Sequence, residues 1–113
     1  MVLVVEDDPD FRALAVRKLR AWGHEVVEAA GVAEALTRAG ERRPDKAVVD
    51  IGLPDGNGFD LTVELLALPW PMRVIVVSSD SSAGNQTAAQ RAGAIRFVPK
   101  QDLFSDAARQ LIA

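Results

Sequence analysis

Acidic, hydroxyl and amine side chains come directly after four short aliphatic runs of this chain. Glu6 and Asp7 follow the run VLVV, and Asp50 ends the run AVVD. Ser78 ends the run VIVVS, and Lys100 follows FVP. If the four runs are parallel strands, their carboxyl ends lie at the same edge of one sheet. The side chains at the four strand ends would then meet there, and together they have the composition of a site that handles a metal ion and a phosphoryl group.

The acids of this group predict a site for a divalent cation. Carboxylates packed together repel each other unless a cation intervenes. Ligation by oxygen alone, without His or Cys, favours Mg²⁺ or Mn²⁺ over zinc. We expect Asp7 and Asp50 to be direct ligands, Glu6 to act through water, and the backbone carbonyl of Gly52 to complete the set. The alternatives are helix capping at Asp7 and its neighbour, and a simple strand-end role for Asp50.

The same group predicts phosphoryl transfer to a carboxylate. A carboxylate can attack phosphorus to form an acyl phosphate, and this chemistry asks mainly for positioning and charge neutralisation. We expect Asp50 to be the nucleophile, Lys100 to supply a positive charge and Ser78 a hydroxyl donor. Taken singly, Lys100 is more simply a solvated amine and Ser78 a turn residue. Their joint placement at strand ends favours the functional interpretation.

Hydrophobic periodicity and turn signals predict the elements that must position these side chains. Strands are expected at 2–5, 25–29, 46–50, 73–78 and 95–98. Helices are expected at 9–22, 31–42, 59–66, 87–92 and 103–112, with loops at 54–58 and 80–85. Alternation of five strands with five helices predicts an α/β fold with a doubly wound five-stranded parallel sheet. The flavodoxin-like strand order 2-1-3-4-5 brings the first and third strands together at the ligand-binding edge.

Composition places the chain among ordinary globular domains and excludes several function classes. The 113 residues are 49% hydrophobic and 26% charged, which suits one domain. A net charge of -3 argues against direct nucleic-acid binding by this domain. The absence of cysteine excludes a disulfide framework. The absence of cysteine also fits a reducing compartment, and the longest apolar runs are too short to span a membrane. We expect a cytoplasmic protein without membrane contact.

The segments VLVVEDDPDF, AVVDIGLPDGNGFDL, VIVVSS and GAIRFVPK resemble the receiver domain of two-component response regulators. The resemblance runs in order through residues 1–113. It implies that Asp50 accepts a phosphoryl group from the phosphohistidine of a sensor histidine kinase or phosphotransfer protein. Glu6 and Asp7 match the family's acidic metal pair, and Lys100 its lysine after the fifth strand. A stand-alone receiver and the N-terminal part of a longer regulator both remain open.

The resemblance also implies a switch and its output. Ser78 matches the hydroxyl position after the fourth strand, and Phe97 matches the aromatic switch position. Phosphorylation would draw Ser78 towards the phosphoryl group and let Phe97 turn inward, a population shift between two packings. The surface of the fourth helix, fifth strand and fifth helix would then bind an output domain or a second copy, with transcription as the expected output. Phe97 as a plain core aromatic is the alternative.

Three rival classes fit the residues less well. A flavin or nucleotide module needs a Gly- or Ser/Thr-rich phosphate loop after the first strand, where this chain has Glu6 and Asp7. A phosphatase of the haloacid dehalogenase kind uses a second Asp two residues after the nucleophile, where this chain has Gly52. A degenerate receiver that only binds partners would not need the full set of acids, hydroxyl and lysine. We therefore expect a phosphoacceptor signalling domain rather than an enzyme acting on other substrates.

Overall fold

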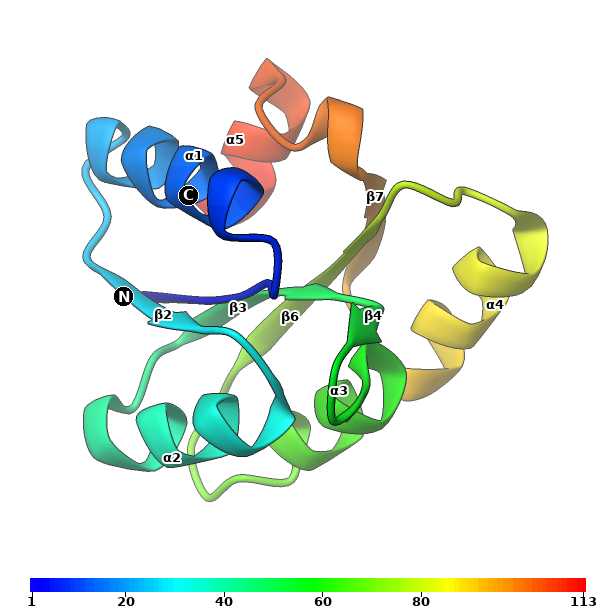
Figure 1. Cartoon of the computed structure of the whole chain (residues 1–113), viewed down its shortest axis with the longest axis horizontal. Helices are drawn as coiled ribbons and strands as arrows, with labels where there is room; N and C mark the ends of the chain where they lie inside the picture. Colours follow the sequence, from blue (N-terminus) through cyan, green and yellow to red (C-terminus); the bar gives the residue numbers. More distant parts are fainter.

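Five short aliphatic strands pair in parallel to form the central sheet of the computed structural model, which describes residues 1–113 (Figure 1). The strands are β1 (Val2–Val5), β2 (Val26–Ala29), β3 (Lys46–Asp50), β6 (Arg73–Ser78) and β7 (Arg96–Pro99). Their order is β2-β1-β3-β6-β7, which confirms the predicted order 2-1-3-4-5. The order reverses between β1 and β3, so the strands that precede the acids are neighbours at the sheet's centre.

Helices cover both faces of the sheet, as an alternating α/β chain requires (Figure 1). They are α1 (Pro9–Ala21), α2 (Val32–Arg42), α3 (Gly58–Leu66), α4 (Ala83–Ala92) and α5 (Asp106–Ile112), with a 3₁₀ turn at Lys100–Asp102. Figure 1 shows α1 and α5 on one face and α2 and α3 on the other, with α4 beside α3. No helix is long and apolar enough to cross a membrane.

Alternating strand residues divide the core into two apolar clusters, one under each helical layer. Val2 and Val4 of β1 pack with α1 and α5, whereas Leu3 and Val5 pack with α2, α3 and α4. All four of these side chains are buried. A strand buried on both faces explains why the sequence shows unbroken aliphatic runs rather than alternation.

Two helices begin three or more residues away from their predicted starts, and side-chain caps explain both. α4 begins at Ala83 rather than residue 87, because the Ser82 hydroxyl accepts a hydrogen bond from the Asn85 N–H at 3.4 Å. The final predicted helix, 103–112, is shorter in the structure. Ser105 caps α5 through the Ala108 N–H, so the chain turns before the helix begins.

The loop expected after Asp50 contains a small antiparallel hairpin. Its strands are β4 (Gly52–Leu53) and β5 (Gly56–Asn57), which pair with each other. The Gly58 N–H donates to the Ile51 carbonyl at 2.8 Å and closes the hairpin at its base. A Cβ on Gly58 would lie 2.3 Å from the Asp50 carbonyl oxygen, so the close approach of the two backbones requires glycine there. Gly58, which follows the hairpin, therefore packs directly against the backbone of the candidate phosphoacceptor.

Candidate functional site

Strand alternation brings three of the predicted site residues to the same side of the sheet. Val4, Val48 and Val98 all pack in the core beneath α1 and α5. Glu6, Asp50 and Lys100 each follow one of these valines by two positions, so their side chains leave the strands towards the same face. Glu6 directly follows β1, Asp50 ends β3 and Lys100 directly follows β7, and the carboxyl ends of these parallel strands meet at one edge of the sheet.

The ammonium group of Lys100 lies between two carboxylates and an aromatic ring. Its Nζ is 2.5 Å from Glu6 Oε1 and 3.4 Å from Asp50 Oδ2. It also lies 4.8 Å from the centroid of the Phe11 ring, within the range of a cation–π contact. The Phe11 ring in turn packs against Phe104, with centroids 5.8 Å apart. The lysine is thus held beside the candidate phosphoacceptor rather than free in solvent.

Burial and mutual charge shift the pKa values of this group. Glu6 is only 2% exposed, and its burial, together with neighbouring Asp50, raises its pKa to about 7, although the Lys100 ammonium pulls in the opposite direction. Burial alone would lower the pKa of Lys100, but its contacts with Glu6 and Asp50 outweigh burial and raise that pKa above its usual value. The site therefore holds a firmly charged amine and an acid that titrates near neutrality.

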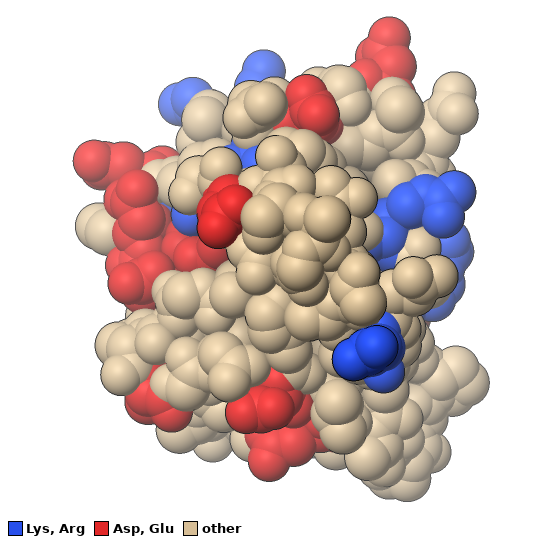
Figure 2. All heavy atoms as spheres, turned by 90° about the vertical axis from the view of Figure 1, so that its right-hand side faces the viewer, with Lys and Arg blue, Asp and Glu red and all other residues tan.

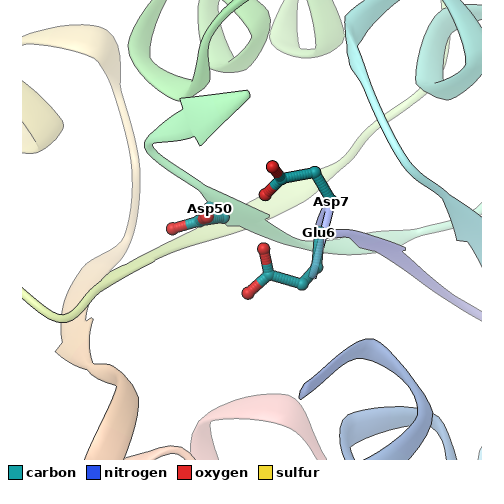
Figure 3. A group of neighbouring side chains, drawn as sticks. All are labelled: Glu6, Asp7 and Asp50. Atoms are coloured by element: carbon teal, nitrogen blue, oxygen red, sulfur yellow. The ribbon is translucent and has the colours of Figure 1, made fainter. Parts of the chain in front are cut away.

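The carboxylates of Glu6, Asp7 and Asp50 form the acidic cluster drawn in Figure 3, at the adjacent ends of β1 and β3. One oxygen from each lies within 4.8 Å of the others. Asp7 and the backbone of Gly52 are exposed, whereas Glu6 and Asp50 are buried. Hard oxygen donors with an open side towards solvent suit Mg²⁺, which keeps several of its waters. The donor set therefore fits the expected cation.

Arg12 of α1 also belongs to the site, although sequence reasoning missed it. Its Nη1 donates to the Glu6 carbonyl at 2.8 Å, and its Nε lies 3.4 Å from Glu28 Oε1 of β2. The Glu6 N–H donates to the Ala29 carbonyl at 3.0 Å, which holds the same turn from the other side. An arginine in the first turns of an amphipathic helix looks like a solvated charge in sequence, so only the fold exposes this role.

Ser78 and Phe97 lie on the opposite side of the sheet from Lys100. Ser78 follows Val76 by two positions, and Phe97 pairs with Val76 across β6 and β7, on the face that packs against α2, α3 and α4. The Ser78 hydroxyl accepts a hydrogen bond from the Asp80 N–H at 3.0 Å. Phe97 is half-buried and lines a pocket of about 400 Å³ between α4 and β7. The sheet edge therefore brings together the acids and Lys100, whereas Ser78 faces the layer of α4.

Comparisons with known proteins agree with this architecture. The family model for the response regulator receiver domain matches residues 2–108. The transcriptional regulatory protein PrrA of Mycobacterium tuberculosis is 39% identical over 105 residues, which cover 93% of this chain and 45% of PrrA. The KDP operon transcriptional regulatory protein KdpE of Escherichia coli is 36% identical over 100 residues, covering 88% of this chain and 44% of KdpE.

Solved structures show the same fold. A response regulator receiver domain protein (CheY-like) from Methanospirillum hungatei superposes with a TM-score of 0.84 at 28% identity, over 98% of this chain and 92% of that one. The receiver domain of NtrX from Brucella abortus gives a TM-score of 0.84 at 28% identity, over 100% and 99% of the two chains. The chain spans less than half the length of PrrA and of KdpE. By family model, sequence and fold, it belongs to the receiver domains of two-component response regulators.

Proposed function

We propose that Asp50 is the phosphoacceptor of a phosphorelay, with a sensor histidine kinase or a phosphotransfer protein as the donor. A carboxylate oxygen of Asp50 forms a bond to phosphorus while the bond from phosphorus to the donor imidazole nitrogen breaks. The donor ring carries a proton on its other nitrogen, so it leaves as neutral histidine, and the product on this chain is an aspartyl phosphate. The observation that carries the proposal is the convergence of Lys100, Glu6 and Asp7 on the Asp50 carboxylate. The domain would catalyse only its own phosphorylation and dephosphorylation.

The residues around Asp50 support this transfer through charge. Mg²⁺, or Mn²⁺, would be held by the carboxylates of Asp7 and Asp50 and the Gly52 carbonyl, with Glu6 acting through water, and when bound it supplies charge neutralisation. Lys100 lies 3.4 Å from Asp50 and is placed to offer its ammonium to a phosphoryl oxygen. The Ser78 oxygen accepts from Asp80, which leaves its O–H free to donate.

The packing of α4 supports a switch based on Ser78 and Phe97. Only Ala89 of α4 is fully buried, so this helix is attached to the sheet by little apolar surface. Movement of Ser78 towards a phosphoryl group would carry the Asp80 N–H with it, and Phe97 lies beside the pocket under α4. Figure 2 shows the face on this side of the molecule, whose centre is free of Lys, Arg, Asp and Glu side chains.

We further propose that the surface of α4, β7 and α5 controls an output domain or binds a second copy of the chain. α4 carries one charged residue, Arg91, which suits a surface that binds a partner without strong electrostatic selection. PrrA and KdpE are transcriptional regulatory proteins more than twice as long as the segment that this chain matches. Control of transcription is therefore the output that the comparisons favour.

A direct test uses a small phosphoryl donor and intact mass. Wild-type protein incubated with acetyl phosphate or phosphoramidate and Mg²⁺ is expected to gain one phosphoryl group. Asp50→Ala should gain none, and omission of Mg²⁺ should abolish the adduct on wild type. An adduct that survives Asp50→Ala, or its absence from folded wild type, would contradict the phosphoacceptor assignment.

A further inference from the structure

Asp55, at the turn of the β4–β5 hairpin, caps the N-terminus of α2. Its Oδ1 accepts a hydrogen bond from the Val32 N–H at 2.7 Å, and its Oδ2 accepts one from the Ala33 N–H at 3.0 Å. The residue that precedes α2 is Gly31, which has no side chain with which to cap the helix. The cap therefore comes from a residue 23 positions further along the chain, and both of its carboxylate oxygens are used.

Two glycines make this contact sterically possible. A Cβ on Gly31 would lie 2.7 Å from Asp55 Oδ1, and a Cβ on Gly56 would lie 2.9 Å from Val32 Cγ2. Neither glycine has a positive φ, so the turn conformation does not demand glycine at either position. Both are needed because the hairpin lies directly against the first turn of α2. The two segments thus approach each other closely at this contact, and the Asp55 carboxylate that joins them is exposed to solvent.

The hairpin that Asp55 holds is the segment that presents the Gly52 carbonyl. Gly52 pairs with Asn57 and Leu53 pairs with Gly56, so the hairpin is a single short unit. Leu53 anchors one side of this unit in the core. Gly52 itself is exposed, and a Cβ there would meet nothing within 4 Å. The position of its carbonyl therefore depends on what holds the hairpin, namely the Gly58 N–H bond to the Ile51 carbonyl at the base and the anchors at Leu53 and Asp55.

We propose that Asp55 is a positioning residue for the metal site: by docking the hairpin on α2 it fixes the Gly52 carbonyl next to the Asp7 and Asp50 carboxylates. The proposal rests on the metal-ligand set assigned under the proposed function. Asp55 touches no proposed ligand side chain, and it acts through the hairpin backbone. Removal of a group that hydrogen-bonds a metal ligand typically weakens metal affinity by about tenfold to a hundredfold, so a residue that acts one step further out is expected at the lower end of that range.

The test measures Mg²⁺ affinity of the full chain by isothermal titration calorimetry, alongside thermal unfolding without metal. Asp55→Ala should weaken Mg²⁺ binding by about tenfold and lower the melting temperature. Asp55→Asn keeps one acceptor oxygen and should recover part of the affinity. Ser105→Ala is the matched control, because it removes the cap of α5 and should lower the melting temperature while leaving Mg²⁺ affinity unchanged.

The outcomes separate this inference from the proposed function. If Asp55→Ala and Asp55→Asn lose stability as Ser105→Ala does and bind Mg²⁺ as wild type does, Asp55 is a structural cap only and the inference is overturned. Faster hydrogen exchange of the Val32 and Ala33 amides in Asp55→Asn, together with weaker Mg²⁺ binding, supports it. If wild type itself binds no Mg²⁺ and forms no aspartyl phosphate, the proposed function fails, and the inference fails with it.

Discussion

The two sides of the sheet edge are built differently. On the side of α1, Glu6 and Asp50 are buried, and Lys100 contacts both of them and the Phe11 ring. On the side of α4, the segment after β6 is held by short-range hydrogen bonds between polar residues. These are Asp80 N–H to Ser78, Ser82 N–H to Asp80, and the Asn85 side chain to the Asp80 carbonyl. Non-covalent contacts between residues of distant strands hold the side of α1, whereas hydrogen bonds within a single segment hold the side of α4.

This difference suits a domain that must both perform chemistry and report its state. Phosphoryl transfer needs charges held in place before the reaction, which long-range contacts between rigid strands provide. The proposed switch needs a small free-energy gap between two arrangements, and a helix with one fully buried residue would favour such a gap. Ser78 lies at the boundary, since it ends a central strand and begins the loop.

The largest effect on phosphorylation is expected from a change on the side of α1. Asp50→Asn keeps the size of the side chain but removes its nucleophilic charge, so phosphorylation by acetyl phosphate should fall below detection. Intact mass checks this, with the far-UV circular dichroism spectrum as the control for folding. A phosphorylated Asp50→Asn protein would mean that another residue accepts the group.

Lys100→Met removes the cation that contacts both acids. The rate of phosphorylation at saturating Mg²⁺ should fall on the order of a hundredfold, the size expected when a preorganised donor to a transferring group is lost. Lys18→Met changes an exposed lysine of α1 and should leave the rate unchanged. Equal rates for the two variants would show that the lysine of the site is not part of the chemistry.

The raised pKa of Glu6 predicts a pH-dependent stability. A folded-state pKa of about 7, above the usual 4.5, means that the folded protein binds this proton more tightly than the unfolded chain does. The contribution of Glu6 to the free energy of unfolding should therefore be full below about pH 4.5 and fall as the pH rises to 7. The loss should be on the order of 2 kcal/mol in metal-free protein.

Urea unfolding of wild type and Glu6→Gln between pH 5 and about pH 8 checks this sign, since the variant cannot titrate at that position. The difference in unfolding free energy between the two proteins should move in favour of Glu6→Gln as the pH rises. A difference that is constant with pH would show that Lys100 holds Glu6 ionised throughout the range, contrary to the direction given by burial.

The smallest effect is expected on the side of α4. Asn85→Ala removes the side-chain hydrogen bond to the Asp80 carbonyl, an exposed contact, and should lower the free energy of unfolding by only about 0.5 kcal/mol. Amides of residues 80–85 should nevertheless exchange faster with solvent, which NMR or mass spectrometry would measure. A loss of about 2 kcal/mol or more in the free energy of unfolding would mean that this loop stabilises the fold as strongly as the acidic side does.

Local patterns in the chain determined much of this structure. Short aliphatic runs such as Val2–Val5, bounded by polar residues and turn signals, were enough to predict the five strands and the order of the sheet. They also predicted that Asp50 and Lys100 lie at the same edge, because parallel strands align their carboxyl ends. These features depend on spacings of a few residues and on connection rules, which a sequence displays directly.

Only the tertiary structure decided which side chains touch. Lys100 pairs with Glu6 across 94 residues, Asp55 caps α2 across 23, and Arg12 holds the Glu6 carbonyl. Ser78 faces the layer of α4 because its place in β6 puts it on the other side of the sheet from Lys100. Such contacts depend on strand register and on the docking of separate elements, where a shift of one residue reverses the face of every side chain. The sequence alone determined most of the elements and the chemistry at their ends, and packing decided how that chemistry is divided between the side of α1 and the side of α4.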